Sequence, residues 1–308
     1  MITGRYLLER LLQLLVTLWA ISLVVFVMLR LAPGDPASIM MGEQASPEQV
    51  DALRRDMGLD EPILVQYVRY MENLLHGDFG RSVRSHRPAL EVVAERIPAT
   101  LQLMASGFLL ALVVGLPIGI LSAVKHGSMI DALARLLALL AQAIPGFWLG
   151  LMMIIVFSVK FGWLPVAGRG SIAHLIMPTI TLSFYFLGLI IRITRSELLD
   201  VLNQDYMRTA RAKGLAERIV LIRHGLRNSM MPLITILGLE LGTLLGGAVI
   251  TETVFSWPGM GTLTVNSIYM HDYPIVQASV LLFGALFIVI NAVVDILYFS
   301  IDPRLRTA

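Results

Sequence analysis

Six long runs of apolar residues, separated by polar segments, dominate the pattern of the chain. Each run approaches the ~20 mostly apolar residues that an α-helix needs to cross roughly 30 Å of hydrocarbon. The pattern therefore predicts an all-α integral membrane protein with six transmembrane helices. The predicted helices cover residues 11–29, 101–123, 133–159, 176–193, 231–250 and 276–299.

Two of the predicted helices carry local features. The run at residues 11–29 is longer than the ~7–15 apolar residues of a secretory signal peptide, and no small-residue cleavage site follows it. We therefore expect it to stay in the protein as a membrane anchor. The run at residues 133–159 contains Pro145, which removes a backbone hydrogen bond and should kink the helix.

The distribution of Lys and Arg predicts the orientation, because short cytoplasmic loops carry an excess of positive side chains. Basic residues precede the first run, follow the last one and gather between residues 192 and 227. The two short loops on the other side hold only Lys160 and Arg169. Both termini are therefore predicted to lie in the cytoplasm.

Composition narrows the class of function. Of the 308 residues 56% are hydrophobic and 15% are charged, whereas a soluble domain carries about 25% charged residues. The net charge of +2 is too small to indicate a nucleic-acid partner. The absence of cysteine excludes disulfides, thiol catalysis and cysteine-bound zinc.

The sequence lacks the motifs of an enzyme. All six histidines fall outside the apolar runs, and neither His-Glu-x-x-His nor Gly-x-Ser-x-Gly occurs. The phosphate loop Gly-x-x-x-x-Gly-Lys-Ser/Thr is also missing, so the chain should not bind ATP. We expect neither catalysis nor a metal or cofactor bound by this chain.

The long segment at residues 32–96, on the outer side, predicts two short helices. Ser46, Pro47 and Gln49 form a capping box with proline at the first helical position, and Gly58 is a plausible stop. A second helix follows residues 60–62 and ends at Gly77. The segment is either a small helical cap packed on the outer membrane face or a docking surface for a soluble delivery protein.

The inner segment at residues 195–230 is the most informative part of the chain. Asp205 can cap a short helix that Gly214 ends. Small residues alternate with basic ones along it: Arg208, Thr209, Ala210, Arg211, Ala212 and Lys213. A basic helix can lie on anionic lipid, but this one carries few large apolar side chains. The alternative is a helix whose backbone sits close to a groove in a partner protein.

Four polar or aromatic residues are candidates for a translocation pathway: Gln142, Glu240, Glu252 and Trp257. Glu240 lies near the middle of the fifth run, where a charge costs ~2.5–3.5 kcal/mol and should face a partner or a wet cavity. The two interpretations are a residue that lines the pore or contacts the solute, and a structural pair between helices. Glu252 opens an outer loop that contains Trp257 and can dip toward the mouth of a pore or simply pack as a turn.

Motifs spread over nearly the whole chain resemble those of the binding-protein-dependent ABC importer permeases. The likeness is to the first of the two permeases in dipeptide, oligopeptide, glutathione and nickel systems. The matching motifs are Leu31-Ala32-Pro33-Gly34-Asp35-Pro36, Gly58-Leu59-Asp60-Glu61-Pro62, Gly77-Asp78-Phe79-Gly80-Arg81-Ser82, Ile97-Pro98-Ala99-Thr100-Leu101, residues 208–214, residues 223–232, Glu252 to Gly261, Asp272-Tyr273-Pro274 and Ile301-Asp302-Pro303-Arg304.

The resemblance implies a type I ABC importer permease fold with a coupling helix at residues 205–214, seated in a groove of a separate ATPase subunit. The coupling motif of the family, Glu-Ala-Ala-x-x-x-Gly with a later Leu-Pro, is only partly kept. Arg208 and Thr209 replace its Glu and first Ala. The residues that fit it are Ala210, Gly214 and Leu226, and Arg227 replaces the Pro.

The resemblance also implies the partners. These are a second paralogous permease, two ATP-binding subunits that hold ATP and Mg, a periplasmic or lipid-anchored substrate-binding protein, and lipid of the bacterial inner membrane. The expected function is ATP-driven import of di- or oligopeptides or similar small solutes by alternating access. Nickel or glutathione import is the alternative.

Three stretches organise the chain on this interpretation: an N-terminal anchor (1–31), an outer helical segment (32–96) and a five-helix permease core (97–308) that includes the inner loop. An ion-coupled secondary transporter is a more distant alternative. Inverted repeats in the sequence would favour this alternative, but the sequence shows none.

Overall fold

The computed structural model describes residues 4–31, 37–38, 46–56 and 58–301. This part of the chain is helical, with one isolated β-bridge between Arg81 and Pro88 and no β-strand. It forms two compact units. Unit 1 combines Met1–Pro98 with Gly259–Val289, and unit 2 combines Ala99–Pro258 with Ile290–Ala308. The prediction of an all-α fold is confirmed.

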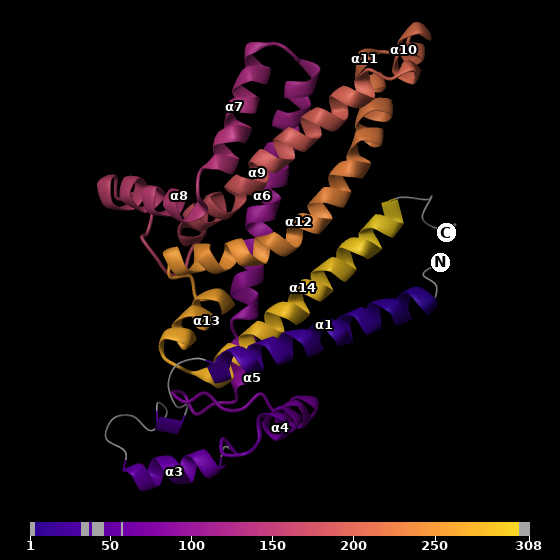
Figure 1. Cartoon of the computed structure of the whole chain (residues 1–308). Helices are drawn as coiled ribbons and strands as arrows, with labels where there is room; N and C mark the ends of the chain where they lie inside the picture. The colour runs from indigo at the N-terminus through magenta and orange to yellow at the C-terminus, as the bar shows by residue number, and fades with distance from the viewer. Residues whose placement is uncertain (1–3, 32–36, 39–45, 57, 302–308) are drawn as a thin grey trace. The chain divides into compact units, whose positions relative to one another are not determined.

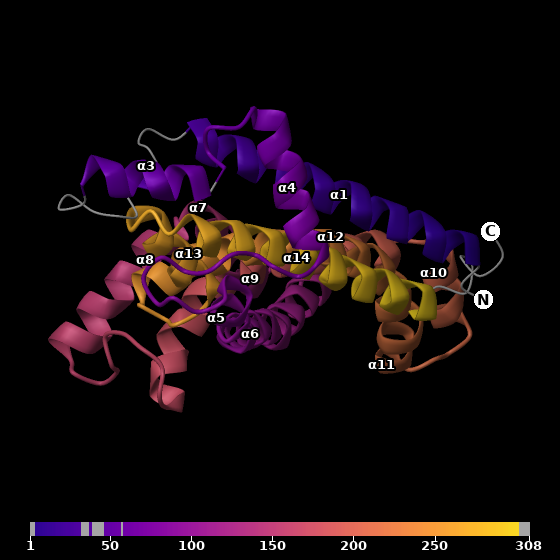
Figure 2. The ribbon, with the colours of Figure 1, turned by 90° about the horizontal axis from the view of Figure 1, so that it is seen from below.

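Unit 1 contains the first helix, the outer segment and the helices that follow residue 259. Its helices are α1 (Gly4–Leu31), α3 (Pro47–Asp56), α4 (Ile63–Leu75), α5 (Ala89–Ala94), α13 (Met260–Tyr269) and most of α14 (Tyr273–Ile301). α1 and α14 lie side by side in Figures 1 and 2, and Gly284 of α14 faces Ile21 of α1. A second apolar cluster joins α5, α13 and α14 through Ala89, Met260 and Ile275.

The outer segment is held together by its own hydrogen bonds. Ser46 Oγ accepts from the Gln49 amide at 3.3 Å and Gln49 Oε1 accepts from the Ser46 amide at 3.0 Å, which confirms the predicted capping box. Gly58 and Gly77 have positive φ, as helix stops require. Arg30 Nε donates to Gln66 Oε1 at 2.8 Å and so joins α1 to α4.

Unit 2 is a bundle of long helices. Its elements are α6 (Ile97–Val124), α7 (Met129–Ala143), α8 (Gly146–Met153), a π-helical turn (Ile154–Lys160), α9 (Ile172–Leu202), α10 (Asp205–Ala212), α11 (Glu217–Ile219), a second π-helical turn (Val220–Leu226) and α12 (Arg227–Val254).

Small residues let the helices of unit 2 approach closely, as is usual between membrane helices. A β-carbon added at Gly119 of α6 would lie 2.7 Å from Thr194 Cβ of α9. One added at Gly188 of α9 would lie 2.7 Å from the Ala138 carbonyl oxygen of α7. α9 therefore runs in contact with both α6 and α7.

Each of the six predicted spans has a helical counterpart. Three helical stretches in the described chain are long and apolar enough to cross a membrane, namely Ala89–Val124, Ile172–Leu202 and Tyr273–Val294. Two bent helix pairs pass the same test together, and α1 contributes a shorter apolar stretch, Leu12–Met28. Whether all six cross the bilayer stays a prediction.

The kink predicted at Pro145 is a complete break. Pro145 precedes the first residue of α8, and the direction of the helix axis bends by 100° between the helices on either side of it. A proline inside a helix removes one backbone bond, but here no helix continues through the proline. Prolines within α6 and α9, by contrast, are accommodated in continuous helices. α12 also continues through Pro232, although it bends by 47° between Gly238 and Glu240.

Candidate functional site

The predicted short basic helix is present as α10, residues Asp205–Ala212. The predicted cap is wrong, because Asp205 is the first residue of the helix, Gln204 is the N-cap, and no side chain caps the helix. It follows α9 after two residues and stands at the end of unit 2 (Figure 1). Gly214 has a φ of +77° and its amide donates to the Arg211 carbonyl at 2.9 Å. The left-handed conformation predicted for Gly214 is therefore confirmed. We call residues 203–226 the α10 loop.

One face of α10 packs against its own chain. Met207 is fully buried, and it forms an apolar cluster with Ala210 and Val220 that Val201 and Leu202 complete. Ala210 is only 7% exposed. The methyl group of Ala210 therefore packs against its own chain, and a coupling role for this residue stays a prediction.

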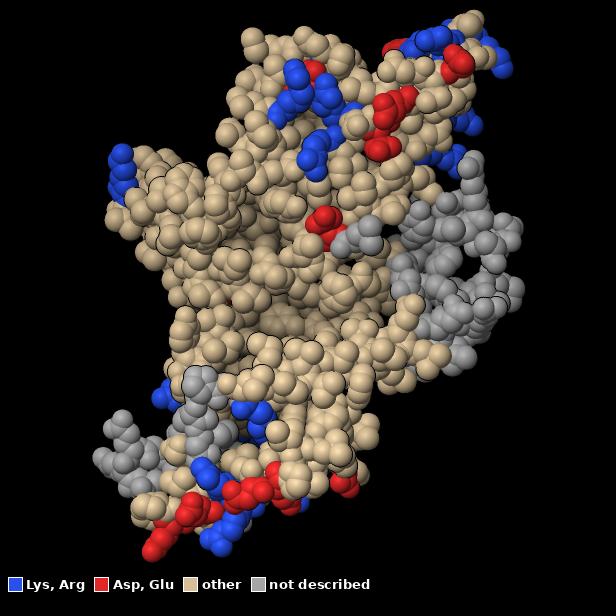
Figure 3. Space-filling view, in the orientation of Figure 1, with Lys and Arg blue, Asp and Glu red and all other residues tan. Residues whose placement is uncertain are grey.

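The other face of α10 is exposed to solvent. It carries five more of the residues predicted for this site, and Lys213 and Gly214, which follow α10, are exposed as well; the five are Asp205, Arg208, Thr209, Arg211 and Ala212. Lys and Arg gather over α10 and α11 in Figure 3. Leu226 is half-buried at the end of the second π-helical turn, one residue before α12. α10 thus exposes a basic surface, while its buried face packs against the rest of the chain.

Ion pairs within the α10 loop occupy some of these charges. Arg211 donates to both carboxylate oxygens of Glu217, at 2.9 and 3.1 Å. These hydrogen bonds raise the pKa of the Arg211 guanidinium. The Arg208–Asp205 pair, at 3.4 Å, is longer, and both side chains are largely exposed. Arg211 is therefore built into the loop, whereas Arg208 and Lys213 face outward.

Sequence reasoning missed an apolar component of this surface. Four large side chains of the loop are between 39% and 51% exposed: Tyr206, Leu215, Ile219 and Ile222. Tyr206 is fixed by Asn228, which donates to its hydroxyl at 3.1 Å. Three of the four come after Gly214, outside the stretch that the basic pattern singled out. Basic and apolar groups therefore share one exposed loop.

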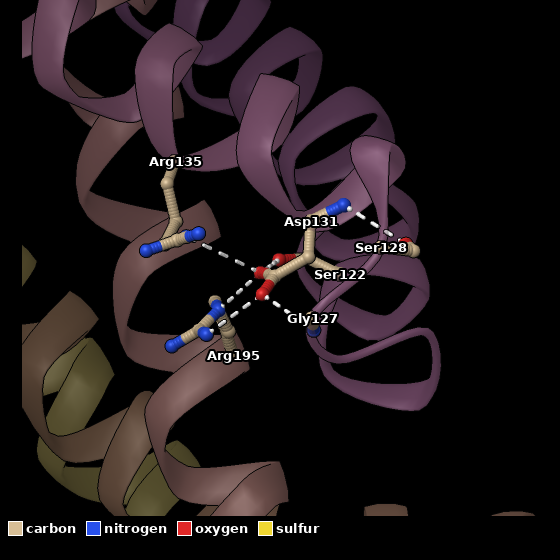
Figure 4. Close-up of polar contacts among 6 residues, drawn as sticks. All are labelled: Ser122, Gly127, Ser128, Asp131, Arg135 and Arg195. Atoms are coloured by element: carbon tan, nitrogen blue, oxygen red, sulfur yellow. Dashed lines mark hydrogen bonds and ion pairs between the residues drawn. The ribbon is translucent and has the colours of Figure 1, made fainter.

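Sequence reasoning also missed a buried carboxylate that lies beside the C-terminal part of α9 (Figure 4). Asp131 of α7 is 1% exposed and accepts four hydrogen bonds. Arg195 of α9 donates at 2.6 and 3.0 Å, Ser122 Oγ of α6 donates at 2.7 Å, and the Gly127 amide donates at 3.1 Å. Arg135 lies 3.7 Å away and is 58% exposed. We call Asp131, Arg195, Ser122 and Gly127 the Asp131 clasp.

Two of the proposed pathway residues come together at the first turns of α6. Glu252 is fully buried and accepts a hydrogen bond from Thr100 Oγ1 at 2.6 Å. Trp257 is also buried, and its indole Nε1 donates to the Ala99 carbonyl at 2.9 Å. Both side chains are therefore packed inside unit 2 in this conformation.

The other two pathway candidates bond within their own helices. Gln142 Nε2 donates to the Ala138 carbonyl at 3.1 Å, one turn back along α7. Glu240 accepts from Thr243 Oγ1 at 2.9 Å, and its side chain is half-buried. A pathway role for all four residues stays a prediction. In the described ranges, no group of three His, Asp or Glu side chains could hold a metal ion.

Comparison with known proteins gives consistent matches along the chain. Residues 115–307 match the family described as "binding-protein-dependent transport system inner membrane component", and residues 3–104 match the N-terminal part of such components. The glutathione transport system permease protein GsiC of Salmonella paratyphi A is 46% identical over 301 residues, which cover 98% of both chains. GsiC of Escherichia coli K12 is 44% identical over the same length.

A solved structure supports the fold. An inward-facing structure of the MetNI methionine ABC transporter matches 68% of this chain and 96% of the compared chain, with a TM-score of 0.58. At 20% sequence identity, this likeness concerns the fold alone. The type I importer permease fold predicted from the motifs is therefore confirmed.

Proposed function

This chain belongs to the family of binding-protein-dependent transport system inner membrane components, the permease subunits of ABC importers, and we propose that it imports glutathione or peptides of similar size. The family assignment makes it a multi-pass protein of the inner membrane. The single observation that carries the proposed solute is the 44–46% identity to glutathione permeases over 98% of the chain.

A nickel path is the less favoured alternative. Nickel is bound in proteins mainly by imidazole and thiolate groups. The chain contains no cysteine, and its histidines lie outside the predicted spans. Glutathione and other short peptides need no such ligands, because amide and carboxylate groups can be carried by hydrogen bonds and water.

The α10 loop is proposed as the contact with a separate ATPase subunit, which binds ATP and Mg. Moving a two-state gate from 1:99 to 99:1 needs ~5.5 kcal/mol of differential binding. One exposed ion pair contributes only ~0–1 kcal/mol, so Arg208 and Lys213 alone are insufficient. The exposed Leu215, Ile219 and Ile222 supply the apolar area that a packed contact requires.

The complete importer is proposed to contain this chain, a second paralogous permease, two ATPase subunits and a substrate-binding protein on the outer side. In that arrangement α10 and both termini of this chain lie in the cytoplasm. The binding protein selects the solute, and alternating access of the two permeases moves it inward.

Uptake by the reconstituted importer tests the solute. The proteoliposomes should contain all subunits, with the ATPase subunits facing the lumen. They should take up labelled glutathione only when ATP is in the lumen and binding protein is outside. Labelled dipeptide and nickel serve as the two competing solutes. Uptake driven by a proton or sodium gradient without ATP would instead indicate a secondary transporter and overturn the proposal.

Cross-linking tests the contact. Because the chain has no cysteine, Ala212→Cys introduces a single thiol on the exposed face of α10. A short heterobifunctional cross-linker should join it to the ATPase subunit. His126→Cys, exposed in the turn between α6 and α7, is the matched control and should give much less product. A thiol at residue 212 that stays fully reactive to water-soluble maleimide in the complete importer contradicts the assignment.

A further inference from the structure

The Asp131 clasp ties together three helices of unit 2. Its carboxylate comes from the first turn of α7, its hydroxyl donor from the end of α6, and its guanidinium from α9. The Gly127 amide adds a donor from the turn between α6 and α7. The α6–α7 hairpin and α9, which are distant in sequence, are thus fastened at one point (Figure 4).

The contacts of the clasp are complete. A carboxylate withdrawn from water is costly unless hydrogen bonds and an opposite charge replace its hydration. Arg195 approaches both oxygens in the paired geometry that makes Arg–carboxylate contacts strong and directional. Ser122 and Gly127 occupy further acceptor positions. Such a pair fixes the register of two helices more narrowly than apolar side chains, which can slide.

The position of Arg195 links the clasp to the α10 loop. α9 continues as one helix from Arg195 to Leu202, and α10 begins at Asp205. Only residues 203 and 204 separate the two helices, so the last two turns of α9 connect α10 to Arg195 by a short path. Next to the clasp, α7 and α9 are also in apolar contact, through Ala134, Ala138 and Ile191.

We propose that Asp131 and Arg195 are positioning residues for energy coupling. They make the α6–α7 hairpin move as one body with α9 when the ATPase displaces α10. This inference rests on the proposed function of the α10 loop. Without the pair, α9 follows α10 but slips along α7, so ATP is hydrolysed without moving the hairpin.

The first test measures solute transported per ATP hydrolysed, in proteoliposomes that contain the complete importer. Asp131→Asn and Arg195→Ala should lower this ratio at least about tenfold, while ATP hydrolysis without binding protein stays within about twofold of wild type. Arg195→Lys keeps the charge but not the paired geometry, and should give an intermediate ratio. Arg135→Ala is the matched control, because it removes an exposed arginine near the same carboxylate, and should behave as wild type.

Two outcomes would overturn the inference. One is an unchanged ratio in both clasp variants. The other is an equal loss of transport and ATP hydrolysis together with poorer assembly, which indicates a purely structural role. If wild-type importer shows no ATP-driven uptake, the proposed function fails instead, and the two failures are thereby distinguished.

A second test begins with an intact clasp, so its first arm does not depend on folding of the clasp variants. Ala134→Cys and Ile191→Cys place two thiols in the apolar contact between α7 and α9 of the otherwise cysteine-free chain. If the two helices move as one body, oxidation to a disulfide should leave transport by the wild-type background within about twofold. The same disulfide should restore coupling to Asp131→Asn. Loss of transport on oxidation would show that α7 and α9 must separate, and would refute the inference.

Discussion

Unit 2 carries two groups of charged side chains that are built in opposite ways. In the Asp131 clasp, Asp131 is 1% and Arg195 is 20% exposed, and donors from α6, from α9 and from the turn after α6 surround the carboxylate. In the α10 loop, Arg208 is 75% and Asp205 is 96% exposed. Figure 3 shows basic side chains over both the turn between α6 and α7 and the α10 loop. One group is satisfied by its own chain, and the other is left to water or to another molecule.

The same contrast separates the two faces of α10. Met207 and Ala210 are buried in the cluster that holds the helix to its own chain, whereas the outer face carries charged residues and is followed in the α10 loop by exposed apolar ones. Protein interfaces commonly combine an apolar centre with a polar rim. The comparison therefore predicts two phenotypes: changes on the buried face should unfold the α10 loop, and changes on the exposed face should only weaken its contact with a partner.

The largest effect is expected at Met207. Met207→Ala leaves a cavity in the cluster behind α10 and should destabilise the loop by about 2–5 kcal/mol. Amide hydrogen exchange at residues 205–214 of the purified protein should speed up strongly, and coupled transport should be lost. Lys213→Ala, on the exposed side, is the control and should leave exchange unchanged. Equal exchange in both variants would contradict the two-face description.

A smaller effect is expected at Gly214, through the backbone alone. Its φ is +77°, and an added β-carbon would meet nothing within 4 Å. A left-handed conformation costs an ordinary L-residue roughly 1–2 kcal/mol, and a β-branched one tolerates it worst. Gly214→Val should therefore reduce coupled transport while the protein still inserts into the membrane.

Asn adopts the left-handed conformation more readily, so Gly214→Asn is the matched control. It should retain most of the wild-type uptake. Similar losses in the two variants would show that the small size of Gly214, in contact with a partner, matters more than its backbone conformation.

The features that could be predicted from the sequence follow local rules. The capping box of α3 depends on two side chains three residues apart, and the stops at Gly58 and Gly214 depend on one backbone angle each. The long apolar helices follow from the length of an apolar run. Such features are encoded in a window of a few residues, so neither the rest of the fold nor a partner is needed to see them.

The features that could not be predicted depend on tertiary contacts. Asp131 reads as an ordinary acidic residue in the first turn of a helix, and Arg195 as one of many basic residues on the inner side. Their pairing joins positions 64 residues apart. The inward position of Ala210 likewise depends on Val220, which follows on a later turn. The apolar pattern of a sequence indicates which segments lie in water and which in lipid. It does not indicate which charged residues form a buried ion pair.

The Arg211–Glu217 pair should contribute less than the backbone and the buried face. Both side chains are well exposed, at 39% and 66%, and exposed pairs are typically worth about 0.2–1 kcal/mol. Arg211→Ala, Glu217→Ala and the double variant form a thermodynamic cycle on hydrogen exchange of the loop. The coupling energy should fall in that range and shrink in high salt. A value near zero would mean that Arg211 serves the partner rather than the loop.

The smallest effect on the chain itself is expected at Arg208, which separates the two regions most sharply. Its pair with Asp205 is long and largely accessible to water. Arg208→Ala should therefore change the opening free energy of the loop, measured by hydrogen exchange without the partner, by no more than about 0.5 kcal/mol. Association with the ATPase subunit should nevertheless weaken by about 0–1 kcal/mol, and more at low salt, because an exposed charge acts through Coulomb attraction that ions screen. Hydrogen exchange of the permease without its partner measures the first quantity. Titration of detergent-solubilised subunits at two ionic strengths measures the second and its salt dependence. Arg208→Ala could instead speed hydrogen exchange of the α10 loop as strongly as Met207→Ala does. In that case α10 has no separate outer face, and its charges stabilise the fold as those of the Asp131 clasp do.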